Sequence, residues 1–353
     1  MDNDFEDIFE NDDEELVQYI NDQHIYVVRD RPDNLNNWND AEFFNRFRLR
    51  KATVNRIFLE IQHLLQHRQE RYHAIPPLQQ LLLALRFYAT GCIYITVGDI
   101  GGIHKTTAGR IIKRVTESLC TLRANYISMP ANENDSANVM QGFYRLARFP
   151  RVIGALDCTH IRIQSPGGAQ PELFRNRKGY FSLNVQAICS SDNRLLNVVA
   201  RWPGSVHDSH IFNSSNVRRD FENNVFENAI LLGDSGYPLR KYIMTPLANP
   251  HGPAENFYNE SHIRTRQVIE RTFGIWKRRF AVLSLGIKCR IPLAQQIIVA
   301  TAILHNIAVE ERDELPADEA AFVGVLERQP QNIYEGEFGA EIRQKFVQYF
   351  ANL

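Results

Sequence analysis

Three acidic side chains stand at places in the sequence where their types and surroundings suit metal-ion chemistry. Asp157 interrupts the run RVIGALDCTHIRI at residues 151–163, whose dense Val, Ile and Leu pattern predicts a buried strand. A carboxylate inside such a strand destabilises the fold unless a cation pairs with it. Asp234 ends a second strand-like run, AILLGDSGY, and Glu270 is the only acid in the stretch RTRQVIERTFGIWKRRF. The three residues are therefore candidates for one shared site.

The chemistry that such a site favours is phosphodiester cleavage. This reaction needs an activated water and a stabilised leaving oxygen, and two bound divalent cations supply both. Mg²⁺ and Mn²⁺ prefer carboxylate and water oxygens as ligands. We therefore expect Asp157, Asp234 and Glu270 to be both the catalytic residues and the ligands of Mg²⁺ or Mn²⁺.

Each acidic residue also has a purely structural interpretation. Asp234 could cap a turn in GDSG, and Glu270 could pair with Arg266 one helical turn earlier. Asp208, in the motif WPGSVHDS, is either a fourth acidic residue near the metals or a helix N-cap, and the cap is the favoured interpretation.

The charges are distributed unevenly along the chain. Residues 17–310 contain 36 Lys and Arg against 23 acids, whereas residues 1–16 contain nine acids and no Lys or Arg. A basic body suggests a polyanion such as DNA as the partner, with charge scattered over a solvated surface as the alternative. The five scattered cysteines indicate a reducing compartment and argue against a zinc cage. We expect no membrane span and no secretory signal, since no run of 18 apolar residues occurs and the N-terminus is acidic.

The elements that precede the first strand are helical. Apolar spacing predicts helices over 52–65, 78–89, 97–101 and 105–119, and the turn at 102–104 gives the last two a helix-turn-helix layout. A structural three-helix bundle is the alternative. The residues expected to contact DNA from the second helix of this pair are Lys105, Thr106, Arg110 and Lys113.

Two further basic segments are candidates for DNA contacts. The turn at 175–180 carries Arg177 and Lys178 beside Gly179, which suits a phosphate or a stacked base but also an ordinary solvated turn. The basic helix that contains Glu270 also carries Arg271 and Lys277, which we expect to contact phosphates.

The remaining segments predict a mixed α/β sheet with sites at its strand ends. We expect an antiparallel three-stranded meander, a helical region, a fourth strand, a loop and then three helices, at residues 151–163, 183–189, 195–202, 208–224, 229–233, 238–263, 263–280, 294–310 and 339–350. The expected domains are an acidic, flexible N-terminus (1–40), a helical region with the helix-turn-helix (41–135), the nuclease core (136–311) and an acidic tail (312–353).

The chain resembles a known family from about Leu78 to Glu310. The motifs that carry the resemblance are, in order, GALDCTHIRI, NRKGYFSLNVQ, WPGSVHDS, LLGDSGYPL, TPL, VIERTFGIWKRRF and ILHNI. They are similar to those of the Harbinger superfamily of DDE transposases and of the host-adopted nucleases derived from them. The resemblance implies an α/β fold with a ribonuclease-H-like catalytic core, preceded by an all-α helix-turn-helix region. It also implies a divalent-metal-dependent D-D-E triad that matches Asp157, Asp234 and Glu270.

The function implied is that of a DNA endonuclease that works by the two-metal mechanism. The location implied is the nucleus, with the cytoplasm as a second location. Two alternatives stay open. One is a catalytically inactive DNA- or protein-binding adaptor on the same fold, and the other is an active transposase that needs a Myb-like DNA-binding partner. A homo-oligomeric state also stays open. The intact triad favours the nuclease, because three like charges are costly to keep together without cations.

Overall fold

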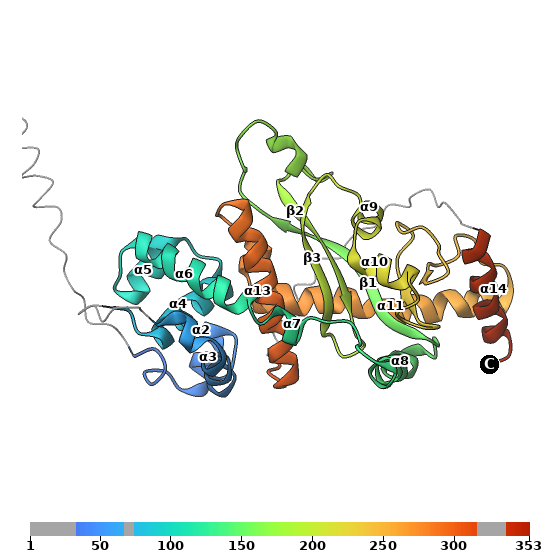
Figure 1. The fold of residues 1–353 in the computed structure, drawn as a ribbon, viewed down its shortest axis with the longest axis horizontal. Coiled ribbons are helices and arrows are strands. Elements are labelled where there is room, and N and C mark those ends of the chain that lie inside the picture. Colours follow the sequence, from blue (N-terminus) through green and yellow to red (C-terminus); the bar gives the residue numbers. More distant parts are fainter. Residues whose placement is uncertain (1–32, 67–73, 316–336) are drawn as a thin grey trace, which may run out of the picture.

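The computed structural model describes residues 33–66, 74–315 and 337–353. The acidic stretch at 1–16 lies outside these residues, as does much of the acidic tail. The N-terminal part of the described chain is helical (Figure 1), and α6 packs on α3, α4, α5 and α13. Its helices are α2 (Asp40–Phe47), α3 (Lys51–Leu65), α4 (Pro77–Thr90), α5 (Tyr94–Gly101), α6 (Lys105–Cys120) and α7 (Arg123–Tyr126).

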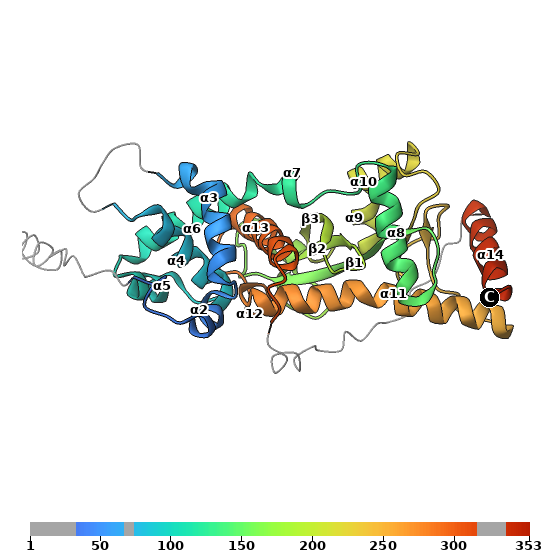
Figure 2. The ribbon, with the colours of Figure 1, turned by 90° about the horizontal axis from the view of Figure 1, so that it is seen from below.

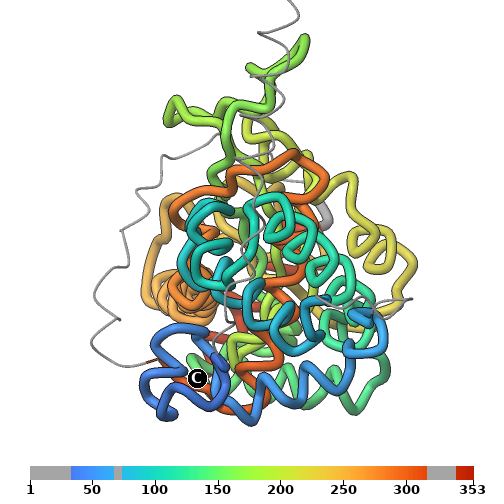
Figure 3. The backbone as a smooth tube through the Cα atoms, turned by 90° about the vertical axis from the view of Figure 1, so that its left-hand side faces the viewer, coloured from blue at the N-terminus to red at the C-terminus, as the bar shows by residue number. Residues whose placement is uncertain are grey.

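The helix pair expected from the sequence is present as α5 and α6. Gly102 ends α5 in the left-handed conformation with φ 60°, and its N–H returns to the Asp99 and Gly98 carbonyls. Such a C-cap favours glycine because glycine has no Cβ to clash. His104 then caps α6 by accepting from the Thr106 N–H. Figure 3 views the molecule from the end formed by these N-terminal helices.

The second half of the chain is built on a five-stranded mixed sheet in the order β3-β2-β1-β4-β5. The predicted antiparallel meander is confirmed, since β2 pairs antiparallel with both β1 and β3. β4 pairs parallel with β1. A short β5, in the segment predicted to be a loop, pairs parallel with β4. The strands are β1 (Val152–Arg162), β2 (Ser182–Cys189), β3 (Leu195–Pro203), β4 (Ile230–Leu232) and β5 (Ile243–Met244).

Helices cover both faces of this sheet. On one face, Leu156 and Ile188 pack with Phe212 and Phe221 of α9 (Asp208–Asn213) and α10 (Asn216–Glu222). On the other face, Ala155 and Ile161 pack in the main core, to which α8 (Glu133–Ala147), α11 (Gly252–Arg279) and α13 (Ile291–Glu310) contribute. The predicted helical region at 208–224 is therefore two short helices.

The long helix α11 corrects the prediction that residues 238–263 form a loop. It begins at Gly252, runs for 28 residues and passes along the sheet (Figure 2). Pro253 lies in its first turn, where the missing N–H leaves no hydrogen bond unmade, so this proline begins the helix instead of preventing it. The early turns are covered by the aromatic residues Phe149, Phe346 and Phe350, the last two from α14 (Glu337–Ala351).

Among the described residues, α13 is the single helix long and apolar enough to cross a membrane by length and composition. Of its most apolar stretch, 67% is buried inside the fold, which is typical of a core helix. Short helices η1 (Pro171–Phe174) and α12 (Val282–Leu285) complete the described elements.

Candidate functional site

The sheet register brings Asp157 and Asp234 side by side. Ala155 of β1 pairs with Leu232 of β4, and each aspartate follows its paired residue by two positions. Neighbouring strands lie about 4.8 Å apart. The two aspartates therefore occupy corresponding positions on neighbouring segments of the chain, with Asp234 just beyond the end of β4. Asp157 is 7% exposed and Asp234 is half-buried. The expectation that these two residues share a site therefore agrees with the register.

Arg266 of α11 links Asp157 to Glu270. Its Nη1 lies 3.1 Å from Asp157 Oδ2, and its Nη2 lies 2.8 Å from Glu270 Oε1. The Arg266 side chain is only 5% exposed, whereas that of Glu270 is 36% exposed. The structural interpretation of Glu270 as the partner of Arg266 is thus correct. The same guanidinium also supplies the cation that buried Asp157 requires.

The electrostatics of the two aspartates favour uptake of positive charge. Burial, and then the neighbouring Asp234, raise the pKa of Asp157, while Arg266 and the Cys158 N–H oppose the rise. Burial also raises the pKa of Asp234, against the Gly236 N–H, which donates to Asp234 Oδ1 over 3.0 Å. Asp234 therefore organises its turn, as the structural interpretation predicts, and also faces Asp157. Two like charges in a desolvated place hold protons or cations more readily than in water.

Asp208 belongs to the same electrostatic cluster, so the prediction that it is an N-cap is wrong. The N-cap of α9 is His207, and Asp208 is the first residue of the helix. Its Oδ1 accepts from Asn184 Nδ2 over 2.8 Å, and its charge raises the pKa of both Asp157 and Asp234. A sequence signal did exist: Asn184 is a polar residue in the middle of buried β2, directly opposite His160 of β1.

A cavity of about 170 Å³ opens beside Asp208. It is bounded by the two motifs NRKGYFSLN and WPGSVHDS, which supply Arg177, Lys178 and His207. Arg177 Nη2 lies 2.7 Å from His207 Nδ1, and the side chains of Arg177 and Lys178 are exposed. Two of the predicted DNA-contacting residues therefore stand at a cavity next to the acidic cluster.

Lys277 lies further along α11 and contacts β1 on the side of Asp157. Its Nζ donates to Thr159 Oγ1 over 2.6 Å and to the His160 carbonyl over 3.0 Å. Burial lowers the pKa of Lys277 to about 8. Across the described residues it has no carboxylate within ion-pair distance.

The other residues predicted to contact DNA lie elsewhere. Arg271 is exposed and donates to Asn193 Oδ1 of the β2–β3 hairpin over 2.9 Å. Lys105, Thr106, Arg110 and Lys113 are exposed along α6, in the helical region. The structure does not bring these five side chains to the acidic cluster.

The donor set is of the kind that a hard divalent cation prefers, because Asp157 and Asp234 offer carboxylate oxygens. The pKa values of both carboxyl groups are raised by burial. Within residues 33–66, 74–315 and 337–353, no three His, Cys, Asp or Glu side chains are close enough to hold one ion. Arg266 stands between Asp157 and Glu270. The structure therefore brings Asp157 and Asp234 to paired positions, while Arg266 holds Glu270 apart from them.

Comparisons with known proteins identify the family of the chain. Residues 156–306, which contain all three carboxylates, match the family described as DDE superfamily endonuclease. The human protein named "Putative nuclease HARBI1" is 36% identical over 270 residues, which cover 75% of this chain and 76% of the relative.

Two further relatives are less similar to this chain. The Xenopus laevis protein of the same name is 32% identical over 71% of this chain and 73% of its own. "Protein ALP1-like" of Arabidopsis thaliana is 24% identical over 68% of this chain and 62% of its own. No solved structure matches the chain significantly.

These matches support a nuclease-type function, and the mixed sheet with its preceding helices is consistent with a ribonuclease-H-like DDE fold. The chain belongs to the family of HARBI1, the Harbinger transposase-derived nucleases among the DDE superfamily endonucleases.

Proposed function

We propose that the protein is a divalent-metal-dependent DNA endonuclease in which Asp157, Asp234 and Glu270 are the catalytic carboxylates. The observation that carries the proposal is that Asp157 of β1 and Asp234, two residues beyond the end of β4, lie at corresponding positions of the two paired segments, with pKa values raised by burial. Bound Mg²⁺ or Mn²⁺ would supply an activated water and a counter-charge for the leaving oxygen. Asp157 and Asp234 would hold these cations.

Arg266 would keep the acidic cluster folded when no cation is bound. It neutralises Asp157 and holds Glu270 at the edge of the cluster. Release of Glu270 from Arg266 would complete the triad. Asp208, held by Asn184, would add negative charge on the side of the cavity.

The cavity beside Asp208 would receive a phosphate of the DNA strand, since Arg177 and Lys178 provide charged donors at its rim. We expect Arg177→Ala to lower the rate of DNA cleavage at subsaturating DNA by about 10- to 100-fold, the effect of losing one charge-assisted hydrogen bond. The matched control is Arg175→Ala in the same loop, because Glu172 already neutralises Arg175 at 2.6 Å. Equal losses in both variants, measured as initial rates, would contradict this role.

The exposed face of α6 would contact the DNA duplex. We expect the double variant Arg110→Ala/Lys113→Ala to bind a duplex more weakly and to reduce the slope of log affinity against log salt by about 2. Fluorescence anisotropy over a range of salt concentrations measures both quantities. Arg145→Ala on α8 serves as the control for a lost surface charge. An unchanged slope in the double variant would remove α6 from the DNA interface.

The function itself is tested by nicking of supercoiled plasmid. The expected result is cleavage with Mn²⁺ or Mg²⁺ and none with EDTA. Because the substrate is DNA, we also propose a nuclear location, and a Myb-like partner would be needed only for transposition.

A catalytically inactive adaptor is a second candidate, because Arg266 already pairs with Asp157 and Glu270 without a metal. It predicts salt-sensitive DNA binding with no cleavage in any divalent cation, which would reject the nuclease.

A further inference from the structure

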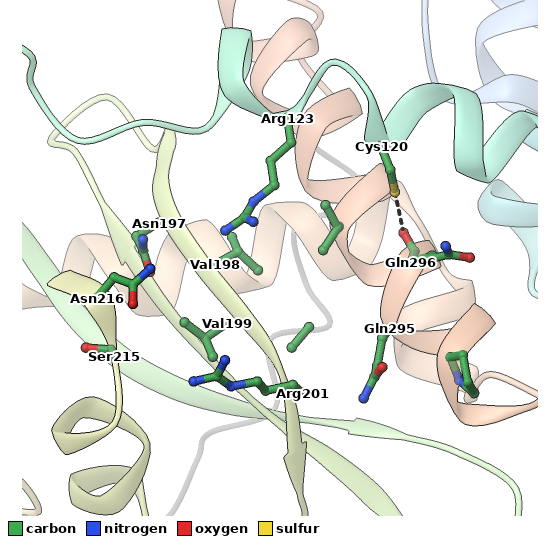
Figure 4. A pocket seen from close by; sticks show the side chains of 13 residues that line it. Cys120, Arg123, Asn197, Val198, Val199, Arg201, Ser215, Asn216, Gln295 and Gln296 are labelled. Atoms are coloured by element: carbon green, nitrogen blue, oxygen red, sulfur yellow. Dashed lines mark hydrogen bonds between the residues drawn. The ribbon is translucent and has the colours of Figure 1, made fainter. Parts of the chain in front are cut away.

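A groove separate from the acidic cluster runs along β3, the edge strand of the sheet. Its volume is about 520 Å³. Residues 197–201 of β3 form its floor, α13 and the α6–α7 junction form one wall, and the start of α10 forms the other. Figure 4 shows Arg123 entering from the α7 side, with Val198 and Val199 on the strand beneath.

The outer edge of β3 is hydrogen-bonded at its beginning, and its backbone groups further on have no such partner among the described residues. At Leu195 the side chain of Asn306 donates to the carbonyl and accepts from the N–H, both over 2.8 Å, as a neighbouring strand would do. From Asn197 to Arg201, no group in the described parts of the chain bonds to the outer side of the strand. An edge strand presents such N–H and C=O groups as a template for another strand.

The charge of the groove is positive. Arg123 and Arg201 line it, and its other lining residues are neutral. Both arginines are exposed, and neither has a carboxylate within ion-pair distance among the described residues. Gln295 and Gln296 add uncharged hydrogen-bonding groups on the α13 wall.

We propose that this groove binds an extended acidic peptide segment of a partner protein, which adds to the sheet as a strand beside β3. Main-chain hydrogen bonds to residues 197–201 would give affinity, and Arg123 and Arg201 would select acidic side chains. The residues of α13 and α10 flank this stretch of β3, and these helices hinder edge-to-edge pairing of whole sheets. A peptide is favoured over DNA because an open strand edge offers alternating N–H and C=O groups, which match another peptide backbone and not a row of phosphates.

The test uses a fluorescein-labelled octapeptide of alternating Val and Glu and the full-length protein. Fluorescence polarisation is expected to show saturable binding that Arg123→Glu/Arg201→Glu weakens at least about tenfold. The control Arg145→Glu/Lys241→Glu, with two exposed cations of α8 and the β4–β5 connection reversed, is expected to bind as the wild type does. Hydrogen exchange of residues 197–201 is expected to slow when the peptide binds.

Two altered probes separate strand addition from simple charge attraction. The same peptide with Lys in place of Glu, and one N-methylated at alternate residues, are both expected to bind at least about tenfold more weakly. Absence of binding to the wild type, or undiminished binding of the N-methylated peptide, overturns the proposal. Weaker binding of a DNA duplex by Arg123→Glu/Arg201→Glu, without peptide binding, would assign the groove to DNA instead.

This inference does not depend on the nuclease. Plasmid nicking by Arg123→Glu/Arg201→Glu is expected to equal that of the wild type, so failure of the peptide test leaves the proposed activity in place.

Discussion

Asp157→Asn and Asp234→Asn are each expected to lower Mn²⁺-dependent DNA cleavage by at least about a thousandfold. Either change removes one of the carboxylates that we propose as metal ligands, and residues that act together in catalysis are each needed for nearly the full rate. Asparagine keeps the shape of each side chain and one acceptor oxygen but no negative charge. The Cys158 N–H to Asp157 and the Gly236 N–H to Asp234 can still find an acceptor. Asp234→Asn should therefore fold as the wild type does, whereas Asp157→Asn also loses the ion pair with buried Arg266 and should be less stable, so the folding of both variants is checked by circular dichroism.

The matched control for this loss is Asp220→Asn on α10. Asp220 is half-buried in the same nuclease core, and its side chain makes no hydrogen bond or ion pair with the described residues. Its variant is expected to nick plasmid at the wild-type rate. Undiminished nicking by Asp157→Asn or Asp234→Asn would show that the assigned carboxylates are not catalytic.

Replacement of Arg266 by Met is expected to cost about 3 kcal/mol of unfolding free energy at pH 8, the usual loss when one partner of a buried ion pair is removed. The change leaves Asp157 beside Asp234 and Asp208 without the cation that offsets them. Chemical denaturation in EDTA measures the effect. Arg264→Met is the matched control, since Arg264 lies on the same helix and is 62% exposed beside Glu260.

The pH dependence of this variant follows from the raised pKa of Asp157. In the folded protein Asp157 keeps a proton at pH values where the unfolded chain has lost it, so the stability linked to this group falls as pH rises. Loss of Arg266 raises the pKa of Asp157 further, and the stability deficit should therefore be larger at pH 8 than at pH 5. Mn²⁺ should restore more stability to Arg266→Met than to the wild type. An equal loss of stability at both pH values, with no effect of Mn²⁺, would contradict the proposal that Arg266 supplies the positive charge for Asp157 when no metal is bound.

Much of the fold follows from local sequence patterns. Alternating and continuous apolar residues predicted the meander and β4, and three- and four-residue spacing predicted the helices of the N-terminal region. The start of α11 did not follow, because Pro250 and Pro253 indicate a loop unless it is known that Pro253 lies in a first helical turn. β5 has only two residues, too few for any periodicity.

The candidate site was predictable in its residue types but not in all its contacts. Asp157 stood out because a carboxylate interrupts a buried strand, which is a local signal. The contact of Arg266 with Asp157 joins residues 109 positions apart, and that of Asn184 with Asp208 depends on how α9 returns to β2. Such contacts are set by the packing of whole elements, so the polar Asn184 in a buried strand indicated a polar partner but did not identify that partner as Asp208.

The most direct measurement is calorimetric titration of Mn²⁺ into the metal-free protein at neutral pH. The wild type and Asp220→Asn are predicted to show saturable binding that is lost in Asp157→Asn and Asp234→Asn. Equal binding in all four proteins, or none in the wild type, would contradict the assignment of a metal-dependent nuclease site to the Asp157–Asp234 pair.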